Sequence, residues 1–237
     1  MDRKRRVLVA GGSSGIGLAT ARAFAEAGDD VTIAGRSPDK LAAAQKSLPI
    51  GVTAERVDAL SDASVAELFG RLGPLHDLVL TVGAGAAMGP FETVGVSAIA
   101  QTLETKLMAQ ARLAHAALEH LSDDGTITFL GGVAGRRPLP GMIAVGVANL
   151  GLQALASALA KELAPLRVNL IAPGLVDTPA YAGMPAEARA AMLRATADTL
   201  PVGRVGQAED IAAAIVAVVR NGYITGAEIE VDGGAHL

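Results

Sequence analysis

The stretch from residue 7 to residue 17 combines a short apolar run with three glycines whose spacing suits phosphate binding. The run 7–10 reads as a buried strand, and Gly11, Gly15 and Gly17 follow it before a helical pattern begins. Such glycines permit a sharp turn and a close approach of the backbone to a ligand, which the N-terminus of the new helix then faces. We therefore predict a cradle for a pyrophosphate, with an ordinary glycine turn as the alternative. The predicted contacts are Gly11, Ser13, Ser14, Ile16 and Gly17.

A second candidate contact lies at the end of the next expected strand, 31–34. Dinucleotide sites place there the residue that reads the adenosine ribose, an acid for the 2′-hydroxyl or a base for a 2′-phosphate. The residues here are Gly35, Arg36 and Ser37, with no acid. Arg36 can form charge-assisted hydrogen bonds to a phosphate, and Ser37 can add a donor. This pattern favours NADP(H) over NAD(H), and the alternative is an arginine that is merely solvated.

Composition excludes several other kinds of chemistry. The chain has no cysteine, so thiol nucleophiles, disulfides and thiolate metal sites are absent. Its four histidines are scattered, and we expect no carboxylates near them at metal-ligand spacing, hence no metal site. A formal net charge of −4 argues against a nucleic-acid partner. The basic run 3–6 is expected to be a solvated flank of the first strand.

The rest of the chain alternates between apolar runs and helical patterns. Strands are expected at 7–10, 31–34, 52–57, 78–81, 125–130 and 167–171, and helices at 18–27, 38–48, 63–72, 96–121, 142–163 and 208–220. This alternation predicts one doubly wound α/β domain over residues 1–237, a Rossmann-type parallel sheet of about seven strands with helices on both faces. The insertion at 177–200 follows a strand end, where it would form a lid over the ligand crevice.

Localisation follows from the apolar stretches. The first apolar run is broken by glycines too early for a signal peptide. The stretch 139–160 is apolar but contains Asn149, Gln153 and Ser157, which disfavours a membrane span. We therefore expect a cytoplasmic protein with no membrane partner.

Several motifs resemble those of the classical short-chain dehydrogenase/reductase family along nearly the whole chain. The spacing Gly-x-x-x-Gly-x-Gly is similar to its glycine-rich loop, with Ala10 where that family usually has threonine. The segments 167–179, 201–210 and 224–234 match its C-terminal half. The resemblance implies cofactor contacts for Asp58 at the adenine, although Asp58 could equally cap the helix near residue 62. It also implies contacts at the central strand end and the nicotinamide, from Gly83, Pro173, Gly174 and Thr178.

The catalytic residues of that family are missing. Its members use Asn, Ser, Tyr and Lys, and the tyrosine and lysine lie four residues apart on one helix face. In this chain Gly132 stands at the serine position, Val145 at the tyrosine position, Asn149 at the lysine position and Lys106 at the asparagine position. Valine cannot donate a proton and glycine cannot polarise a carbonyl. Asn149 can still hydrogen-bond a ribose hydroxyl.

Two functions remain open. The first is an NADP(H)-dependent oxidoreductase acting on a small carbonyl or alcohol, with a displaced proton donor such as Lys106, Tyr181 or water. Lys106 would be a buried ammonium of lowered pKa or an anion binder, unless it extends out to solvent. The second is a catalytically silent nucleotide-binding sensor or partner subunit. Small residues on the helices 96–121 and 142–163 permit close packing, and the resemblance implies a homodimer or homotetramer.

Overall fold

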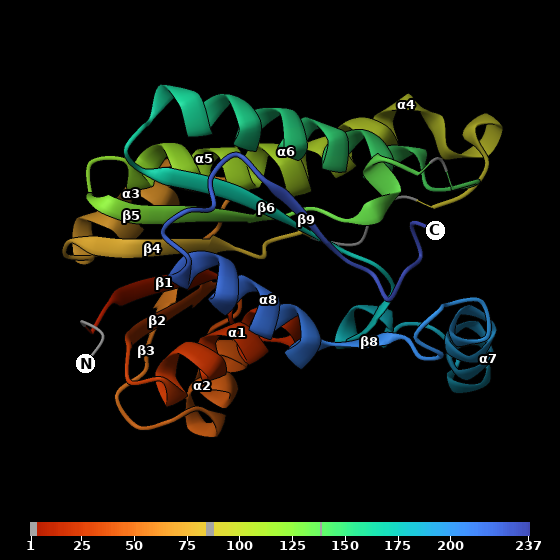
Figure 1. The fold of residues 1–237 in the computed structure, drawn as a ribbon, viewed down its shortest axis with the longest axis horizontal. Coiled ribbons are helices and arrows are strands. Elements are labelled where there is room, and N and C mark those ends of the chain that lie inside the picture. The colour runs from red at the N-terminus through yellow and green to blue at the C-terminus, as the bar shows by residue number, and fades with distance from the viewer. Residues whose placement is uncertain (1–3, 84–87, 138) are drawn as a thin grey trace.

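The computed structural model describes residues 4–83, 88–137 and 139–237. Seven parallel strands form one sheet in the order β3-β2-β1-β4-β5-β6-β9 (Figure 1). They are β1 (Arg6–Ala10), β2 (Asp30–Gly35), β3 (Thr53–Arg56), β4 (Leu75–Leu80), β5 (Leu121–Leu130), β6 (Arg167–Pro173) and β9 (Glu228–Val231). A separate short pair joins β7 (Val176–Asp177) to β8 (Gly206–Gln207). The predicted Rossmann-type fold is confirmed.

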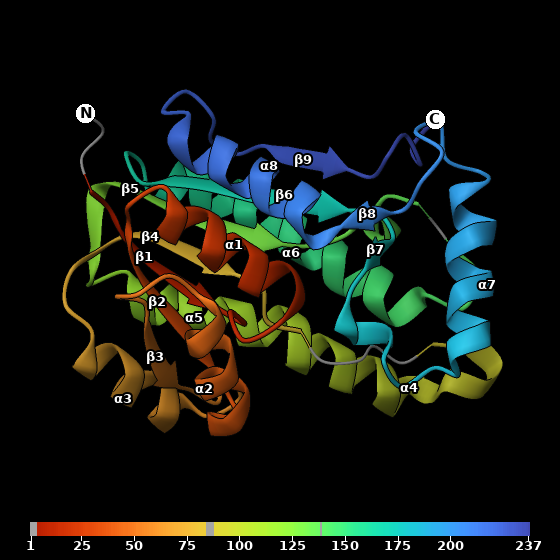
Figure 2. The same cartoon turned by 90° about the horizontal axis from the view of Figure 1, so that it is seen from below.

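Helices cover both faces of the sheet, as Figures 1 and 2 show. One face carries α3 (Asp62–Arg71), α4 (Phe91–Thr102), α5 (Ala109–Ala117) and α6 (Ile143–Glu162). The other carries α1 (Gly15–Glu26), α2 (Pro38–Ser47) and α8 (Ala208–Arg220). The remaining helix, α7 (Ala186–Ala197), lies beyond the sheet near β8.

The core consists of two apolar layers because the central strands are buried on both sides. Leu8, Leu78 and Ile127 point to the layer under α3, α5 and α6. Their neighbours Val9 and Val79 point to the layer under α1 and α8. Side chains alternate along a strand, so a strand between two helical layers is buried on both faces and is mostly apolar. This is why the run 78–80 is continuously hydrophobic.

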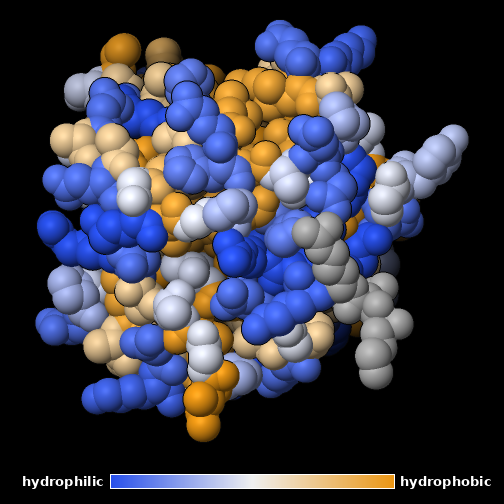
Figure 3. Space-filling view, turned by 90° about the vertical axis from the view of Figure 1, so that its left-hand side faces the viewer, coloured by the Kyte–Doolittle hydropathy of each residue, from blue (hydrophilic) through white to orange (hydrophobic). Residues whose placement is uncertain are grey.

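The strand order places a crevice at the carboxyl ends of the strands. The chain leaves β1 in one direction to form β2 and β3, and β4 then pairs on the other side of β1. The crossovers diverge at this point, and ligands of doubly wound sheets bind there. The opposite end of the molecule carries mainly hydrophilic side chains with smaller apolar patches (Figure 3).

The long helix expected over 96–121 is not one regular helix. It begins earlier, at Phe91, has a non-helical residue at Gly95, and changes to a π-helix over Leu103–Met108 (η1) before α5. The strand β5 already begins at Leu121. A π-helical turn adds one residue and rotates the side chains around it, and such turns are frequent at functional sites. No period in the sequence marks this change.

The structure also bears on two expectations, one for the basic N-terminal run and one for the apolar stretch that forms α6. Arg5 is not a solvated residue: its Nε lies 2.7 Å from the buried Asp77 carboxylate. A buried aspartate needs such a partner, so this part of the basic run belongs to the fold, while Arg3 lies outside the described residues. The helix α6 is long and apolar enough to cross a membrane by length and composition alone. A core helix passes the same test, and α6 packs on β6.

Candidate functional site

The glycine loop is held tightly against the neighbouring strand end. A Cβ at Gly17 would lie 2.3 Å from the Gly11 carbonyl oxygen, and one at Gly11 would lie 2.5 Å from Thr81 Oγ1. The Thr81 hydroxyl in turn donates to the Ala10 carbonyl at 2.8 Å. Glycine is therefore required here by packing as well as by the positive φ of +89° at Gly11 and +51° at Gly15. Ile16 packs on the apolar layer beneath, and Ser14 is the N-cap residue of α1 without a side-chain capping bond.

Arg36 and Ser13 lie at the carboxyl end of β2. Arg36 is exposed, and among the described residues no carboxylate pairs with it. Ser13 Oγ approaches to 3.4 Å from the position of a Cβ on Gly35, so the serine lies next to the arginine. Ser37 caps α2 by accepting from the Lys40 amide at 3.4 Å. A guanidinium and a hydroxyl beside a glycine loop form a suitable binding site for a phosphate monoester.

The loop after β6 reaches over the glycine loop. The Thr178 side chain lies 3.5 Å from the position of a Cβ on Gly15, so these two predicted cofactor contacts are neighbours. The Thr178 hydroxyl also accepts from the Ala180 amide at 3.4 Å. Pro173 ends β6, and Gly174 packs on Asp232, where a Cβ would lie 2.8 Å from the Asp232 Cα.

Asp58 does not cap the following helix. The N-cap residue of α3 is Ser61, whose hydroxyl accepts from the Ser64 amide. The Asp58 carboxylate instead accepts from the Leu60 amide at 3.1 Å, in a local turn after β3. The capping alternative is therefore wrong, and a role in contacting adenine stays a prediction.

Lys106 lies in the π-helical turn and extends between the ends of β4 and β5. Its Nζ donates to the Gly131 carbonyl at 3.0 Å. Its alkyl chain passes Gly83, where a Cβ would lie 3.7 Å from Lys106 Cγ. Among the described residues no carboxylate forms an ion pair with this ammonium. The neighbours of Gly83 in the family motif, Ala84 and Gly85, lie outside the described residues.

Burial lowers the pKa of Lys106 from its usual 10.5 to about 8, because desolvation disfavours the charged form. At neutral pH the folded chain therefore keeps an ammonium at a cost in stability. Replacing Lys106 with methionine, which retains the apolar stem, is expected to raise the free energy of unfolding at pH 7 by on the order of 1–3 kcal/mol. The comparison is urea unfolding of both proteins.

The sign of the pH dependence follows from the same shift. The folded-state pKa is below the unfolded one, so between about pH 8 and 10.5 the unfolded chain binds more protons at this site. The wild type should therefore gain stability relative to Lys106→Met as pH rises through that window. The exposed Lys161→Met on α6 is the control and should change stability by less than about 0.5 kcal/mol. An Lys106→Met variant less stable than the wild type at pH 7 would contradict the assignment.

Asn149 and Gly132 face each other at the positions of the missing lysine and serine. Asn149 Nδ2 donates to the Gly132 carbonyl at 3.0 Å, while its Oδ1 is buried without a hydrogen-bond partner among the described residues. A Cβ on Gly132 would lie 2.9 Å from that Nδ2. Val145, one turn earlier on α6, is partly buried. Lys106, Gly132 and Asn149 thus meet at one place, around the carbonyls that end β5.

Gln110 is a residue that the sequence interpretation missed. It is fully buried on α5, and its Nε2 donates to the carbonyls of Val82 and Leu130 at 3.0 and 3.2 Å. Its Oε1 accepts from the Leu130 amide at 3.3 Å. This side chain therefore links the ends of β4 and β5. A glutamine within an otherwise apolar helix face was the available signal.

Tyr181, the other candidate donor, lies on a 3₁₀ turn over Pro179–Tyr181, after β7. Burial raises its pKa, so the phenol stays protonated near neutral pH. No hydrogen bond joins it to Lys106 or Asn149 among the described residues.

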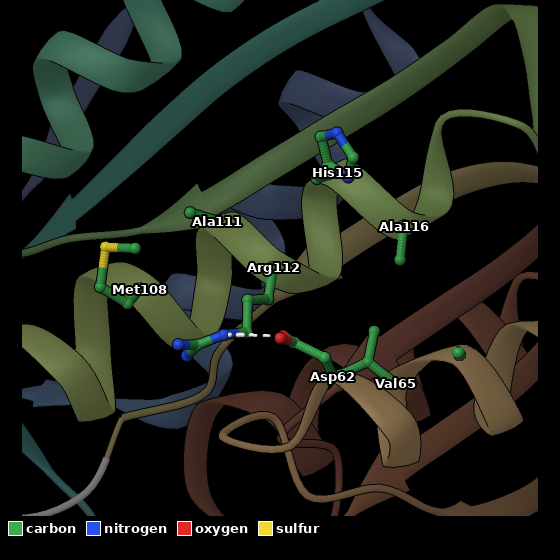
Figure 4. Close-up of a pocket in the computed structure, with 8 residues that line it drawn as sticks. Asp62, Val65, Met108, Ala111, Arg112, His115 and Ala116 are labelled. Carbon is green, nitrogen blue, oxygen red and sulfur yellow. Dashed lines mark ion pairs between the residues drawn. The ribbon is translucent and has the colours of Figure 1, made fainter.

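The hollow between α3 and α5, with a volume of about 430 Å³, is not part of this site. It is crossed by the ion pair of Arg112 with Asp62 (Figure 4) and contains none of the predicted cofactor contacts.

At the C-terminus, the expectation that no histidine has carboxylates nearby is wrong. The ligand atoms of Glu230, Asp232 and His236 lie within 4.8 Å of one another.

Comparison with known proteins agrees with the fold. A family model described as Enoyl-(Acyl carrier protein) reductase matches residues 10–236. The cis-4-hydroxycyclohexanecarboxylate dehydrogenase of Sinomonas cyclohexanicum is 33% identical over 98% of this chain and 96% of its own. Carbonyl reductase family member 4 of Danio rerio is 30% identical over 98% of both chains.

Solved structures of other proteins also superpose on nearly the whole chain. A small-chain dehydrogenase in complex with NADPH superposes with a TM-score of 0.84 at 33% identity, over 98% of this chain and 99% of that one. The MalC reductase/Diels-Alderase of Malbranchea aurantiaca superposes with a TM-score of 0.90 at 27% identity, over 98% and 96%. Because the family model and these relatives span almost the whole chain, the protein belongs to the short-chain dehydrogenase/reductase family of oxidoreductases, with a Rossmann-type fold.

Proposed function

We propose that this chain is an NADP(H)-dependent oxidoreductase that interconverts a small carbonyl compound and its alcohol, with Lys106 as the proton donor. The observation that carries the proposal is the Lys106 ammonium at the ends of β4 and β5, whose only hydrogen bond to a described residue goes to the Gly131 carbonyl at 3.0 Å. An ammonium has three protons, so two remain for a substrate oxygen.

The residues present fit a nicotinamide dinucleotide phosphate. Asn149 Oδ1 is a buried acceptor with no partner in the described part of the chain, and a ribose hydroxyl would satisfy it. Gly11 and Gly17 have no room for a Cβ, so the backbone there can approach a pyrophosphate closely at the N-terminus of α1. Arg36 is an exposed cation without a carboxylate partner among the described residues, and it follows β2, where dinucleotide-binding proteins carry the residue that reads the adenosine ribose.

In the reduction, the cofactor supplies a hydride to the carbonyl carbon when it is bound. Lys106 supplies a proton to the carbonyl oxygen from its Nζ and is left as a neutral amine, which solvent reprotonates. A pKa of about 8 permits both protonation states near neutral pH. In the direction of alcohol oxidation the neutral amine accepts the proton. The ammonium also stabilises negative charge that develops on the oxygen.

The alternative function is a catalytically silent nucleotide-binding sensor or partner subunit. Val145 and Gly132 favour it, since neither can move a proton. A screen of carbonyl compounds with NADPH, and of alcohols with NADP⁺, separates the two. Turnover that depends on Lys106 supports the oxidoreductase, and the absence of turnover with intact NADPH binding supports the silent protein.

We further propose that residues 1–237 act as one cytoplasmic domain and that residues 177–200 form the substrate lid. Within that segment, Arg189 on α7 forms an ion pair with Asp177, which joins the lid helix to the loop after β6. A homodimer or homotetramer is proposed through the helices that cover one face of the sheet. Leu150 and Val147 on α6 are exposed apolar residues that such an interface would bury.

Arg36→Ala is expected to weaken NADPH binding by about 10- to 100-fold, because one or two charge-assisted hydrogen bonds to a phosphate are lost. NADH binding should change by less than about 3-fold, since NADH has no 2′-phosphate. Calorimetric titration of the nucleotide-free protein measures both. Lys46→Ala, at the exposed far end of α2, is the matched control. Equal losses for NADPH and NADH would contradict the role of Arg36.

A further inference from the structure

The C-terminal turn gathers two carboxylates around one imidazole nitrogen. His236 Nδ1 lies 3.1 Å from both oxygens of Asp232 and 3.5 Å from Glu230 Oε2. All three ligand atoms lie within 4.8 Å of one another. We propose that Glu230, Asp232 and His236 form a binding site for one divalent transition-metal cation such as Zn²⁺.

The spacing of the three atoms fits a common ion. Zinc binds imidazole nitrogen and carboxylate oxygen at about 2.0–2.2 Å, so two ligand atoms on one ion are roughly 3–3.5 Å apart. The contacts from His236 to Asp232 and Glu230 already have this separation. The imidazole favours a transition metal over magnesium, which prefers oxygen ligands.

The backbone fixes this arrangement before any ion binds. Glu230 and Asp232 are two residues apart at the end of β9, so they project on the same face. Gly233 and Gly234 have positive φ of +68° and +86° and turn the chain back, which brings His236 over those carboxylates. A Cβ at Gly234 would lie 2.7 Å from Pro201, so the turn is packed against its surroundings.

The charge balance around the turn leaves room for a cation. Glu228 lies on the same face as Glu230 and Asp232, giving three carboxylates. Arg136 pairs with Glu228 at 2.6 Å and reaches Glu230 only at 3.8 Å. Arg137 also reaches this turn, where it donates to the Ala235 carbonyl, so three carboxylates lie near two guanidinium groups and one negative charge is in excess. A divalent ion would neutralise the excess.

The proposed site is open to solvent on one side, and on the other side it is packed against the rest of the fold. The His236 side chain is 45% exposed and that of Glu230 22%, which leaves an entry path, while Asp232 is 3% exposed. The Asp232 backbone packs on Gly174, so the ion would order the turn that supports the loop after β6. The proposal does not depend on redox activity.

Calorimetric titration of the EDTA-treated full chain with ZnCl₂ tests the site. We expect one Zn²⁺ per chain and an increase in Tm on binding. His236→Ala and Glu230→Gln should each weaken binding by at least about 10-fold and remove the Tm increase. The control His115→Ala, which removes an exposed histidine on α5, should bind as the wild type does.

Three outcomes would overturn the proposal. The first is an absence of saturable Zn²⁺ binding, which would make His236 only an ion-pair partner of the two carboxylates. The second is unchanged affinity in His236→Ala. The third is binding of Mg²⁺ as tightly as Zn²⁺, since carboxylates alone would then hold the ion. Circular dichroism of each variant confirms that a lost heat signal does not arise from unfolding.

Discussion

Lys106→Ala is expected to lower the turnover number by about 10²- to 10⁴-fold, the usual effect of removing a positioned general acid. The variant removes the only ammonium that binds the Gly131 carbonyl among the described residues, and it leaves the glycine loop and Arg36 unchanged. NADPH affinity should therefore stay within about 3-fold of the wild type. Steady-state kinetics on an active carbonyl substrate, together with calorimetry, separate the two effects.

The pH dependence of the turnover number is expected to identify Lys106 as the titrating group. Carbonyl reduction requires the protonated ammonium, so the rate should fall as pH rises through about 8. Alcohol oxidation requires the neutral amine and should rise over the same range. Lys106→Arg keeps the positive charge but cannot release a proton at this pH, so this variant should lose turnover and the limb near pH 8. A limb that persists in Lys106→Arg would assign the step to Tyr181 or water.

The fold could be predicted because each strand carries its own signal. The central strands are mostly apolar, since helices cover both of their sides, and the run 78–80 shows this directly. The end of α1 could also be predicted, because Gly28 follows it. The helix α8 has the predicted bounds.

The site could be predicted only in part, because its geometry depends on contacts between distant segments. The glycine spacing indicated a tight turn, but not that Thr81, directly after β4, fills the space beside Gly11 and Gly17. The π-helical turn that holds Lys106 leaves no periodic trace in the sequence. The role of Gln110 in linking β4 to β5 depends on a register that only the folded sheet defines.

The same limit explains the missed C-terminal cluster. Glu230, Asp232 and His236 are close in the sequence, yet their convergence requires the two positive-φ glycines between them to form one particular turn. Spacing alone does not distinguish that turn from an extended tail. Likewise, nothing in the basic run indicates that Arg5 pairs with Asp77, which lies 72 residues later in the chain.

Gly132→Ser is expected to be harmful alone and tolerated with Asn149→Lys. A Cβ at residue 132 would lie 2.9 Å from Asn149 Nδ2, which is held by its hydrogen bond to the Gly132 carbonyl. The residues at positions 132 and 149 are thus physically coupled. A double-mutant cycle in urea unfolding should give a coupling free energy of about 0.5–3 kcal/mol. Additive effects of the two substitutions on the free energy of unfolding would show that positions 132 and 149 are not coupled.

The complete set of replacements is then expected to create a second, different catalytic centre. In Gly132→Ser, Val145→Tyr, Asn149→Lys and Lys106→Asn combined, the tyrosine and the new lysine lie four residues apart on α6, where the ammonium lowers the pKa of the phenol. Relative to Lys106→Asn alone, NADPH-dependent turnover should rise by about 10²- to 10⁴-fold. The matched control carries Val145→Phe in place of Val145→Tyr, because phenylalanine fills nearly the same space but has no hydroxyl proton to donate. If that control is equally active, the tyrosine does not supply the proton, and the crevice itself sets the rate.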